Sequence, residues 1–135
     1  MTTQQKPTDS ELEILQILWK HPTGCTVRFV NDELNKQRPD NEVGYTTTLK
    51  MMQIMAEKQL LLRDESQRTH VYMVNVSQEK MQQSALDKVL NSVFGGSAMK
   101  LVMQALGNQK TSKEELNQIR SLLDEIEQKQ KGGAQ

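Results

Sequence analysis

The amino-acid sequence predicts a mainly α-helical protein with one small β-hairpin. Three stretches with apolar residues at helical spacing come first, and two short apolar runs separated by a polar loop follow. Beyond the second run the apolar residues again recur in steps of three and four. We therefore expect a DNA-binding domain of the winged type at 1–75, a helical dimerisation region at 76–130 and a disordered tail at 131–135.

The first helix is marked at both ends. Thr8 and Glu11 have the spacing of a capping box, in which each side chain accepts a hydrogen bond from the other residue's amide. A broad apolar stripe follows over residues 12–19, and Pro22 and Gly24 then break the helix. This pattern predicts one amphipathic helix that packs against a core.

Two further helices and the hairpin complete the N-terminal half. The second helix is expected from about Thr26 to the Arg38-Pro39 break, and the third from Tyr45 to Lys58 with Leu49, Met52, Met55 and Ala56 facing inward. Residues 60–63 and 71–74 read as strands, and the polar segment 64–69 has the length of a hairpin loop. Three helices and a hairpin in this order indicate a winged helix-turn-helix, whose third helix lies in the major groove of DNA.

The first turn of the third helix carries hydroxyl groups where a packing helix would carry apolar residues. Tyr45, Thr46 and Thr47 lie where free backbone amides suit phosphate oxygens, and Lys50 follows on the same face. Threonine can also bond to base edges or touch a thymine methyl group. We interpret this turn as a contact surface; the alternative is that the threonines only cap the helix.

The C-terminal half is expected to form helices that find a partner. A second capping box is predicted at Thr111 and Glu114, and the last helix has apolar residues in alternating steps of three and four. So short a segment cannot bury these stripes in a core of its own, and a second copy of the chain is the simplest partner. The expected dimerisation residues are Val89, Val93, Val102, Leu106, Leu116, Ile119, Leu123 and Ile126.

The charge of the chain does not by itself indicate nucleic-acid binding. The sequence has 17 basic and 17 acidic residues, and residues 1–75 contain nine basic against ten acidic side chains. A basic footprint is thus absent, which counts against DNA as a partner.

Several other classes of protein are disfavoured. The apolar runs are far shorter than the roughly 20 residues of a membrane span, and residues 1–10 are too polar for a secretory signal. With Cys25 as the single cysteine and His21 and His70 as the two histidines, we expect no catalytic residues, no metal site and no cofactor. The same features lead us to expect a cytoplasmic protein with no direct membrane insertion.

Taken together, these segments resemble the penicillinase repressors, the BlaI/MecI/CopY family of bacterial transcriptional repressors. The resemblance covers nearly the whole chain and rests on the ordered set TDSELEILQILW, TVRFVNDEL, YTTTLKMMQIMAEKQLL, HVYMVNVS and SKEELNQIRSLLDEIE. It implies a winged helix that binds a palindromic operator in double-stranded DNA, C-terminal helices that form a homodimer, and a membrane sensor-protease as a partner. The DNA-binding residues that the family pattern and the helix start together indicate are Thr26, Arg28, Tyr45, Thr46, Thr47, Lys50, Gln67 and Arg68.

The chain departs from the family pattern at three places. Family members usually have glycine after the lysine that closes the third helix, where this chain has Gln59, so strain of about 1 kcal/mol is expected there. The β-lactam-responsive members are cleaved at an Asn-Phe bond, and Gln104-Ala105 stands at the matching position. The tail also lacks the cysteines of the copper-responsive members. Induction by proteolysis at this bond is therefore in doubt, and copper sensing is not expected.

Two other functions remain open on the sequence alone. The balanced charge is also compatible with a winged helix that binds protein without sequence-specific DNA binding. The second open function is that of a repressor whose dimerisation half binds a small ligand. A steep dependence of binding on salt would separate DNA binding from protein binding.

Overall fold

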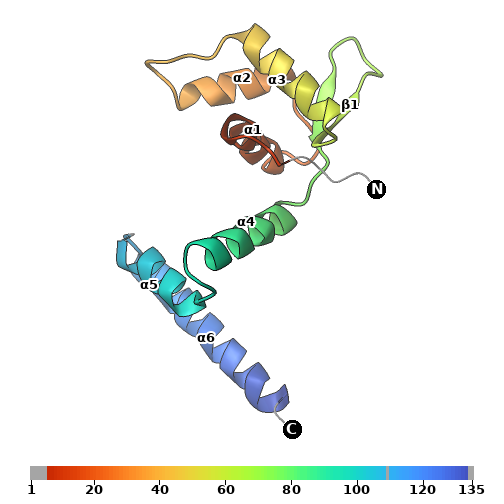
Figure 1. Ribbon diagram of the computed structural model, residues 1–135. Helices are drawn as coiled ribbons and strands as arrows, with labels where there is room; N and C mark the ends of the chain where they lie inside the picture. Colours follow the sequence, from red (N-terminus) through yellow and green to blue (C-terminus); the bar gives the residue numbers. More distant parts are fainter. Residues whose placement is uncertain (1–5, 109, 134–135) are drawn as a thin grey trace. The chain divides into compact units, whose positions relative to one another are not determined.

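The computed structural model describes residues 6–108 and 110–133 and contains the predicted three helices, hairpin and C-terminal helices in that order (Figure 1). The chain divides into two compact units, Met1–Ser84 and Ala85–Gln135. The first unit thus extends past the boundary expected at residue 75. Trp19 and Met81 explain the extension: the Trp19 indole Nε1 donates to the Val76 carbonyl at 3.0 Å, and Met81 packs on the core.

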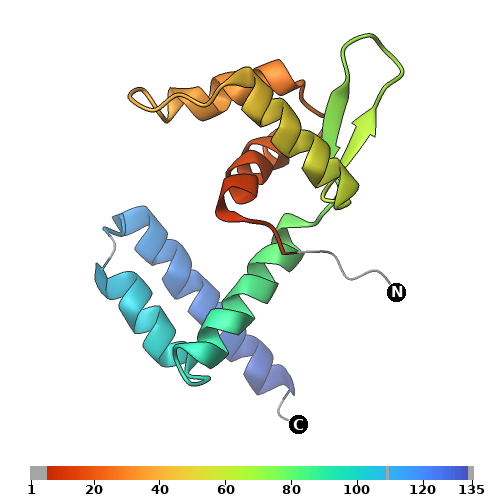
Figure 2. The same cartoon turned by 45° about the horizontal axis from the view of Figure 1, so that its top comes forward.

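Three helices enclose the core of the first unit (Figure 2). They are α1 (Asp9–Trp19), α2 (Val27–Lys36) and α3 (Tyr45–Glu57). The fully buried side chains are mostly apolar and come from all three helices and the hairpin: Ile14, Leu15, Leu18, Val30, Met52, Met55, Leu60, Leu61 and Tyr72. Burial of these side chains is the main favourable contribution to folding of this unit.

The hairpin pairs β1 (Leu61–Asp64) with β2 (Val71–Val74) in antiparallel register, with Arg63 opposite Tyr72. The first strand begins and ends one residue later than expected, because Leu60 lies in the turn that follows α3. Cys25 adds a third, single-residue pairing: its amide donates to the Tyr72 carbonyl at 2.9 Å, and the Tyr72 amide donates back at 2.8 Å. The residue between two helices is thereby tied to the hairpin.

Gly24 allows that pairing. Its φ angle is +108°, and a Cβ atom there would lie 2.5 Å from the Val71 Cγ1 atom. Only glycine combines this backbone conformation with so close an approach to β2.

The expected capping box of α1 is present and also joins two helices. The Glu11 amide donates to Thr8 Oγ1 at 3.2 Å, and the Thr8 amide donates to Glu11 Oε1 at 2.9 Å. Lys58 Nζ, just after α3, donates to both Glu11 carboxylate oxygens at 3.0 and 2.9 Å. Burial would raise the pKa of Glu11, but the Thr8 amide and Lys58 outweigh it and lower that pKa.

The turn after α3 shows the strain expected at Gln59. This residue has a φ angle of +66°, and it is the single non-glycine residue with positive φ among those described. Its position follows the helix end, where the Leu60 amide donates to the Met55 carbonyl in a left-handed cap. The Asn75 side chain also donates to the Gln59 carbonyl at 2.9 Å.

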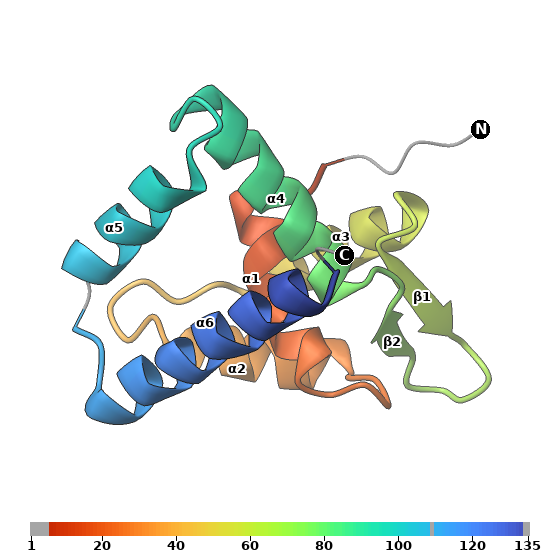
Figure 3. The same cartoon turned by 90° about the horizontal axis from the view of Figure 1, so that it is seen from below.

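The second unit is built from helices (Figure 3), and two of them, the fourth and fifth of the chain, have no buried side chain. α4 (Gln78–Ser92) leads into it from the first unit, and α5 (Ala98–Asn108) and α6 (Lys113–Gly133) follow. α6 begins one residue later than the capping box expected at Thr111 and Glu114 implies, and Ser112 caps it: the Ser112 hydroxyl oxygen accepts from the Glu115 amide at 3.1 Å. α6 includes the first residues of the expected tail, and residues 134–135 lie outside the described residues.

Within the described residues, no helix combines the length and hydrophobicity that crossing a bilayer requires.

Candidate nucleic-acid interface

Two asparagines of α2 hold the turn that precedes α3. The Asn31 and Asn35 side chains donate to the Val43 carbonyl at 2.9 and 3.0 Å, and the Val43 amide donates to Asn35 Oδ1 at 2.7 Å. Gly44 then forms the N-cap of α3 without a side-chain hydrogen bond. The direction in which the first turn of α3 points is thus set by α2.

Thr48 differs from the other two threonines. It is fully buried, and the Asn31 side chain donates to its hydroxyl oxygen at 2.9 Å. Thr48 therefore belongs to the packing surface of α3, unlike the two threonines before it. A buried hydroxyl is tolerated here because it has a hydrogen-bond partner that also orients α2 against α3.

The remaining polar residues of this turn are exposed, as expected for a contact surface. Tyr45, Thr46, Thr47 and Lys50 all lie on the solvent-facing side of α3. Because Gly44 occupies the N-cap and no side chain caps the helix, the alternative that the threonines only cap α3 is not supported. Their hydroxyl groups and the free first-turn amides remain available to a ligand.

The start of α2 lies beside the start of α3. Thr26 is the N-cap of α2, and its hydroxyl oxygen accepts from the Phe29 amide at 3.1 Å. The Arg28 guanidinium lies over the Tyr45 ring at 4.7 Å, a cation–π contact. Thr26 therefore has a capping role in addition to the phosphate contact expected of it, and Arg28 is held against the first residue of α3.

The loop between the strands carries the other two expected residues. Gln67 and Arg68 are exposed near its tip. The Ser66 amide donates to Asp64 Oδ1 at 2.9 Å, which shapes the start of the loop. Hydrogen bonds from Ser66 lower the pKa of Asp64, so this residue keeps its negative charge.

A groove of about 300 Å³ connects these three elements. Its lining includes Arg28 from α2, Tyr45 from α3 and Arg68 from the loop, together with residues that the sequence did not indicate. The polar lining residues are Thr26, Arg28, Tyr45, Gln53, Arg63, Arg68, Thr69, His70 and Tyr72. No carboxylate lines this groove, although the chain as a whole is neutral.

Gln53, Arg63 and His70 are thus new candidates. Gln53 follows Lys50 by three residues, so helical spacing could have found it once the exposed face of α3 was known. Arg63 alternates with Leu62 along β1 and lies on the side of Leu61. The two-residue period of a strand places Arg63 on the same side as Leu61, but the period alone does not show that this side faces the groove.

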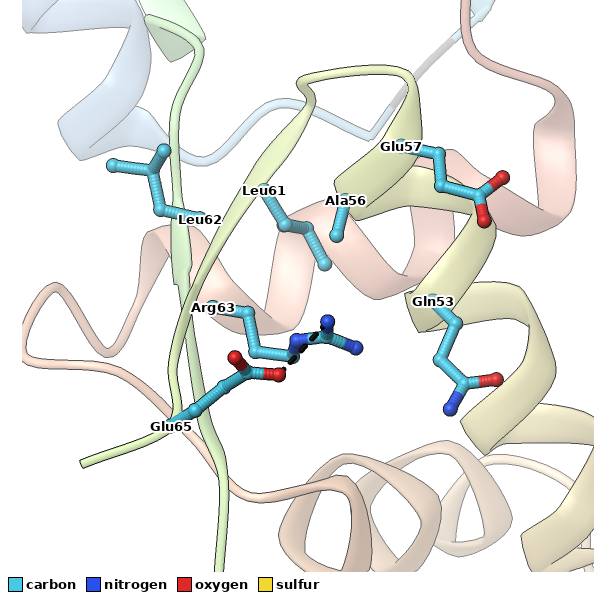
Figure 4. A pocket seen from close by; sticks show the side chains of 7 residues that line it. All are labelled: Gln53, Ala56, Glu57, Leu61, Leu62, Arg63 and Glu65. Atoms are coloured by element: carbon cyan, nitrogen blue, oxygen red, sulfur yellow. Dashed lines mark ion pairs between the residues drawn. The ribbon is translucent and has the colours of Figure 1, made fainter. Parts of the chain in front are cut away.

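A second pocket, which Arg63 also lines, lies between the end of α3 and β1 (Figure 4). Its polar lining residues are Gln53, Glu57, Arg63 and Glu65. The Arg63 Nη2 atom lies 2.9 Å from Glu65 Oε1. Glu57 and Glu65 therefore line this pocket, whereas no carboxylate lines the neighbouring groove.

The expected dimerisation residues lie on α4, α5 and α6, except Val93, which directly follows α4. Val89, Val93, Val102, Leu106, Leu123 and Ile126 are exposed, whereas Leu116 and Ile119 are partly covered. Val93 is 70% exposed and Leu123 60%. Apolar side chains so open to water need a covering surface.

Cys25 and His21 both lie in packed surroundings. Cys25 is buried, and burial raises the pKa of its thiol, which disfavours the thiolate. His21 packs edge-on against the Phe29 ring at 4.8 Å. No group of three or more potential metal ligands occurs within 6–108 and 110–133.

Comparison with known proteins identifies the family. The profile described as "Penicillinase repressor" matches residues 7–125 of the chain. The chain belongs to the penicillinase repressor family. It is a DNA-binding transcriptional repressor with a winged helix, and this membership also supports the prediction that it is not an enzyme.

Two curated penicillinase repressors are similar over nearly their full length. The repressor of Bacillus licheniformis is 25% identical over 125 residues, which are 92% of this chain and 94% of that protein. The repressor of Staphylococcus aureus is 22% identical over 120 residues, which are 89% of this chain and 92% of that protein.

Two solved structures are similar to part of the chain. The solution structure of the DNA-binding domain of the repressor BlaI is 26% identical and covers 58% of this chain and 90% of that one, with a TM-score of 0.48. The monomeric form of Bacillus licheniformis BlaI, in complex with the blaP half-operator, is 25% identical and covers 58% of this chain and 92% of that one, with a TM-score of 0.47.

The Gln104-Ala105 bond of this penicillinase repressor lies inside α5. Both residues are exposed, and the Asn108 side chain donates to Gln104 Oε1 at 3.1 Å. The Gln104-Ala105 bond is therefore part of a regular helix.

Proposed function

We propose that the chain represses transcription as a homodimer that binds a two-fold symmetric operator, with the first turn of α3 in the major groove. The observation that carries this proposal is the groove between α2, α3 and the hairpin loop. It brings Arg28, Arg63 and Arg68 together beside the exposed threonines, and it has no carboxylate in its lining. Backbone phosphates are the ligand that such a surface suits best.

The position of each residue indicates whether it contacts bases or phosphates. Thr46 and Thr47 are exposed on the first turn of α3, which suits them to base edges. Arg28, Lys50 and Arg68 flank that turn and suit phosphates, which position the helix without reading the sequence. Gln53 lies one helical turn beyond Lys50 on the exposed face of α3, and its side-chain amide can pair with adenine.

A dimer accounts for the exposed side chains of the second unit. Val93, Val102, Leu123 and Ile126 are all exposed in the single chain; Val93 directly follows α4, Val102 lies on α5, and Leu123 and Ile126 lie on α6. A second copy that covers these side chains would give a two-fold axis, and a two-fold dimer binds half-sites related by the same symmetry. The palindromic operator follows from the dimer.

Binding of protein in place of DNA is the rival function, and one observation favours it. Ile54 is 38% exposed on α3 and Leu62 is 51% exposed on β1. Ile54 thus gives α3 an exposed apolar side chain. An apolar contact of this kind would depend little on salt.

A titration of duplex DNA of mixed sequence at a series of salt concentrations separates the two functions. With Arg28, Lys50, Arg63 and Arg68 on phosphates, log K should fall with log salt with a slope of roughly −3 to −4 for each bound chain. Lys50→Ala should make this slope shallower by about one unit. Binding that is absent or independent of salt would favour the rival.

A further inference from the structure

Arg63 occupies a special position because it lines both the arginine-rich groove and the pocket beside it. In Figure 4 its side chain extends from β1 toward α3, with the Glu65 carboxylate next to the guanidinium. Tyr72 lies opposite Arg63 in the hairpin register and is buried. The backbone pairing of Tyr72 with Cys25 anchors β2, the strand that pairs with the one carrying Arg63.

Glu65 and Arg63 remain accessible to a ligand. Their side chains are 54% and 36% exposed, and the distance between Arg63 Nη2 and Glu65 Oε1 is 2.9 Å. Glu57 lies in the same pocket and adds a second negative charge near Arg63. Together with the Tyr72 hydroxyl, these carboxylates raise the pKa of Arg63, so the guanidinium stays charged and paired in the free protein.

We propose that Glu65 is an internal competitor that occupies Arg63 in the free repressor and limits its affinity for DNA. A backbone phosphate that approaches the groove must displace the Glu65 carboxylate from Arg63, since both anions use the same guanidinium. The inference rests on the proposed DNA-binding function and adds a residue that sets the strength of that binding. Because phosphate contacts carry no sequence information, the effect should be equal on all duplexes.

The test is the affinity of the full chain for a fluorescent duplex of mixed sequence, measured over a series of salt concentrations. Glu65→Gln keeps the shape of the side chain and removes its charge. We expect binding to tighten by about two- to fivefold, the size that release of an exposed ion pair allows. The salt slope should stay close to that of the wild type, because Arg63 engages a phosphate in both complexes.

Glu79→Gln is the matched control. Glu79 is exposed in the first turn of α4, and no ion pair involves it among the described residues. The substitution changes the net charge of the chain by the same amount as Glu65→Gln. It should leave the affinity close to that of the wild type.

Arg63→Met completes a double-mutant cycle and keeps the apolar stem of the side chain. Glu65→Gln should have no effect on affinity in the Arg63→Met background, and thermal melting of each variant checks that it folds. Equal tightening with or without Arg63 would overturn the inference, as would a Glu65→Gln affinity equal to that of the wild type. A wild-type chain that binds no duplex at any salt would overturn the proposed function and this inference together.

Discussion

Thr47 and Thr48 are neighbours in the sequence with opposite roles. Thr48 is buried with its hydroxyl bonded to Asn31, whereas Thr47 is exposed at the start of α3. Three consecutive residues of a helix span most of a turn, so they cannot share one face. The side chain that faces the core serves packing, and its neighbours are left for a ligand.

Replacing Thr47 with Ala should cost about 1–3 kcal/mol of binding free energy on the best operator site. The loss should be smaller on a site altered at the contacted base pair, because that contact is already missing. Affinities for a panel of single-base operator variants measure this. Folding should be unaffected, since alanine favours an exposed helix position, and thermal melting is the control. An equal loss on every variant would make Thr47 a backbone contact and not a base contact.

Gln59 offers a test of strain in the turn after α3. Gln59→Gly should raise the free energy of unfolding by up to about 1 kcal/mol, because glycine adopts a φ angle of +66° without steric cost. Chemical denaturation of the two proteins measures the difference. Gln59→Ala keeps a Cβ atom and should give no such gain. A glycine variant less stable than the wild type would show that the Gln59 side chain has a stabilising contact.

Among the elements, α1 and α3 are joined by the buried Glu11 carboxylate. Its pKa is lowered by the Thr8 amide and Lys58, so it stabilises the fold at pH values above its unfolded pKa of about 4.5. That contribution is lost as the pH falls through the lower, folded pKa.

Glu11→Gln should therefore destabilise the protein near neutral pH by about 1–3 kcal/mol. The difference from the wild type should shrink as the pH falls from about 4.5 through the lower, folded pKa of Glu11, because the wild-type carboxylate becomes protonated over this range, first in the unfolded chain and then in the folded one. Denaturation at a series of pH values measures both effects. Glu79→Gln is the control and should show neither. A Glu11→Gln deficit that stays constant down to low pH would contradict a role for the charge.

The order of elements was predictable because each one carries a local signal. The Thr8 box, the Pro22 and Gly24 break and the change of period near residue 60 depend only on neighbouring residues. The groove was not predictable in the same way, because Arg63 and Arg28 come from elements that the fold brings together. The net charge of the chain is zero and did not indicate this local excess of arginine, because carboxylates such as Glu57 and Glu65 line the adjacent pocket instead of the groove.

On the scale of the whole molecule, the exposed stripes of the second unit predict self-association. Ile119→Asp combined with Leu123→Asp would place charges in an apolar interface at a cost of several kcal/mol. Sedimentation should then show a monomer with much weaker operator binding. Gln118→Asp with Ser121→Asp adds the same charges to exposed polar positions of α6 and should remain dimeric. If the Ile119 and Leu123 variant sediments as a dimer, the interface lies elsewhere.

Selection of binding sites by the full chain from random duplex DNA tests the central claim most directly. A homodimer that reads each half-site with α3 should enrich a two-fold symmetric consensus, with half-site centres about 10–10.5 base pairs apart or a multiple of that spacing. The monomeric Ile119 and Leu123 variant should enrich a single half-site at most. No enrichment, or an asymmetric site bound by a single chain of the wild type, would contradict the account.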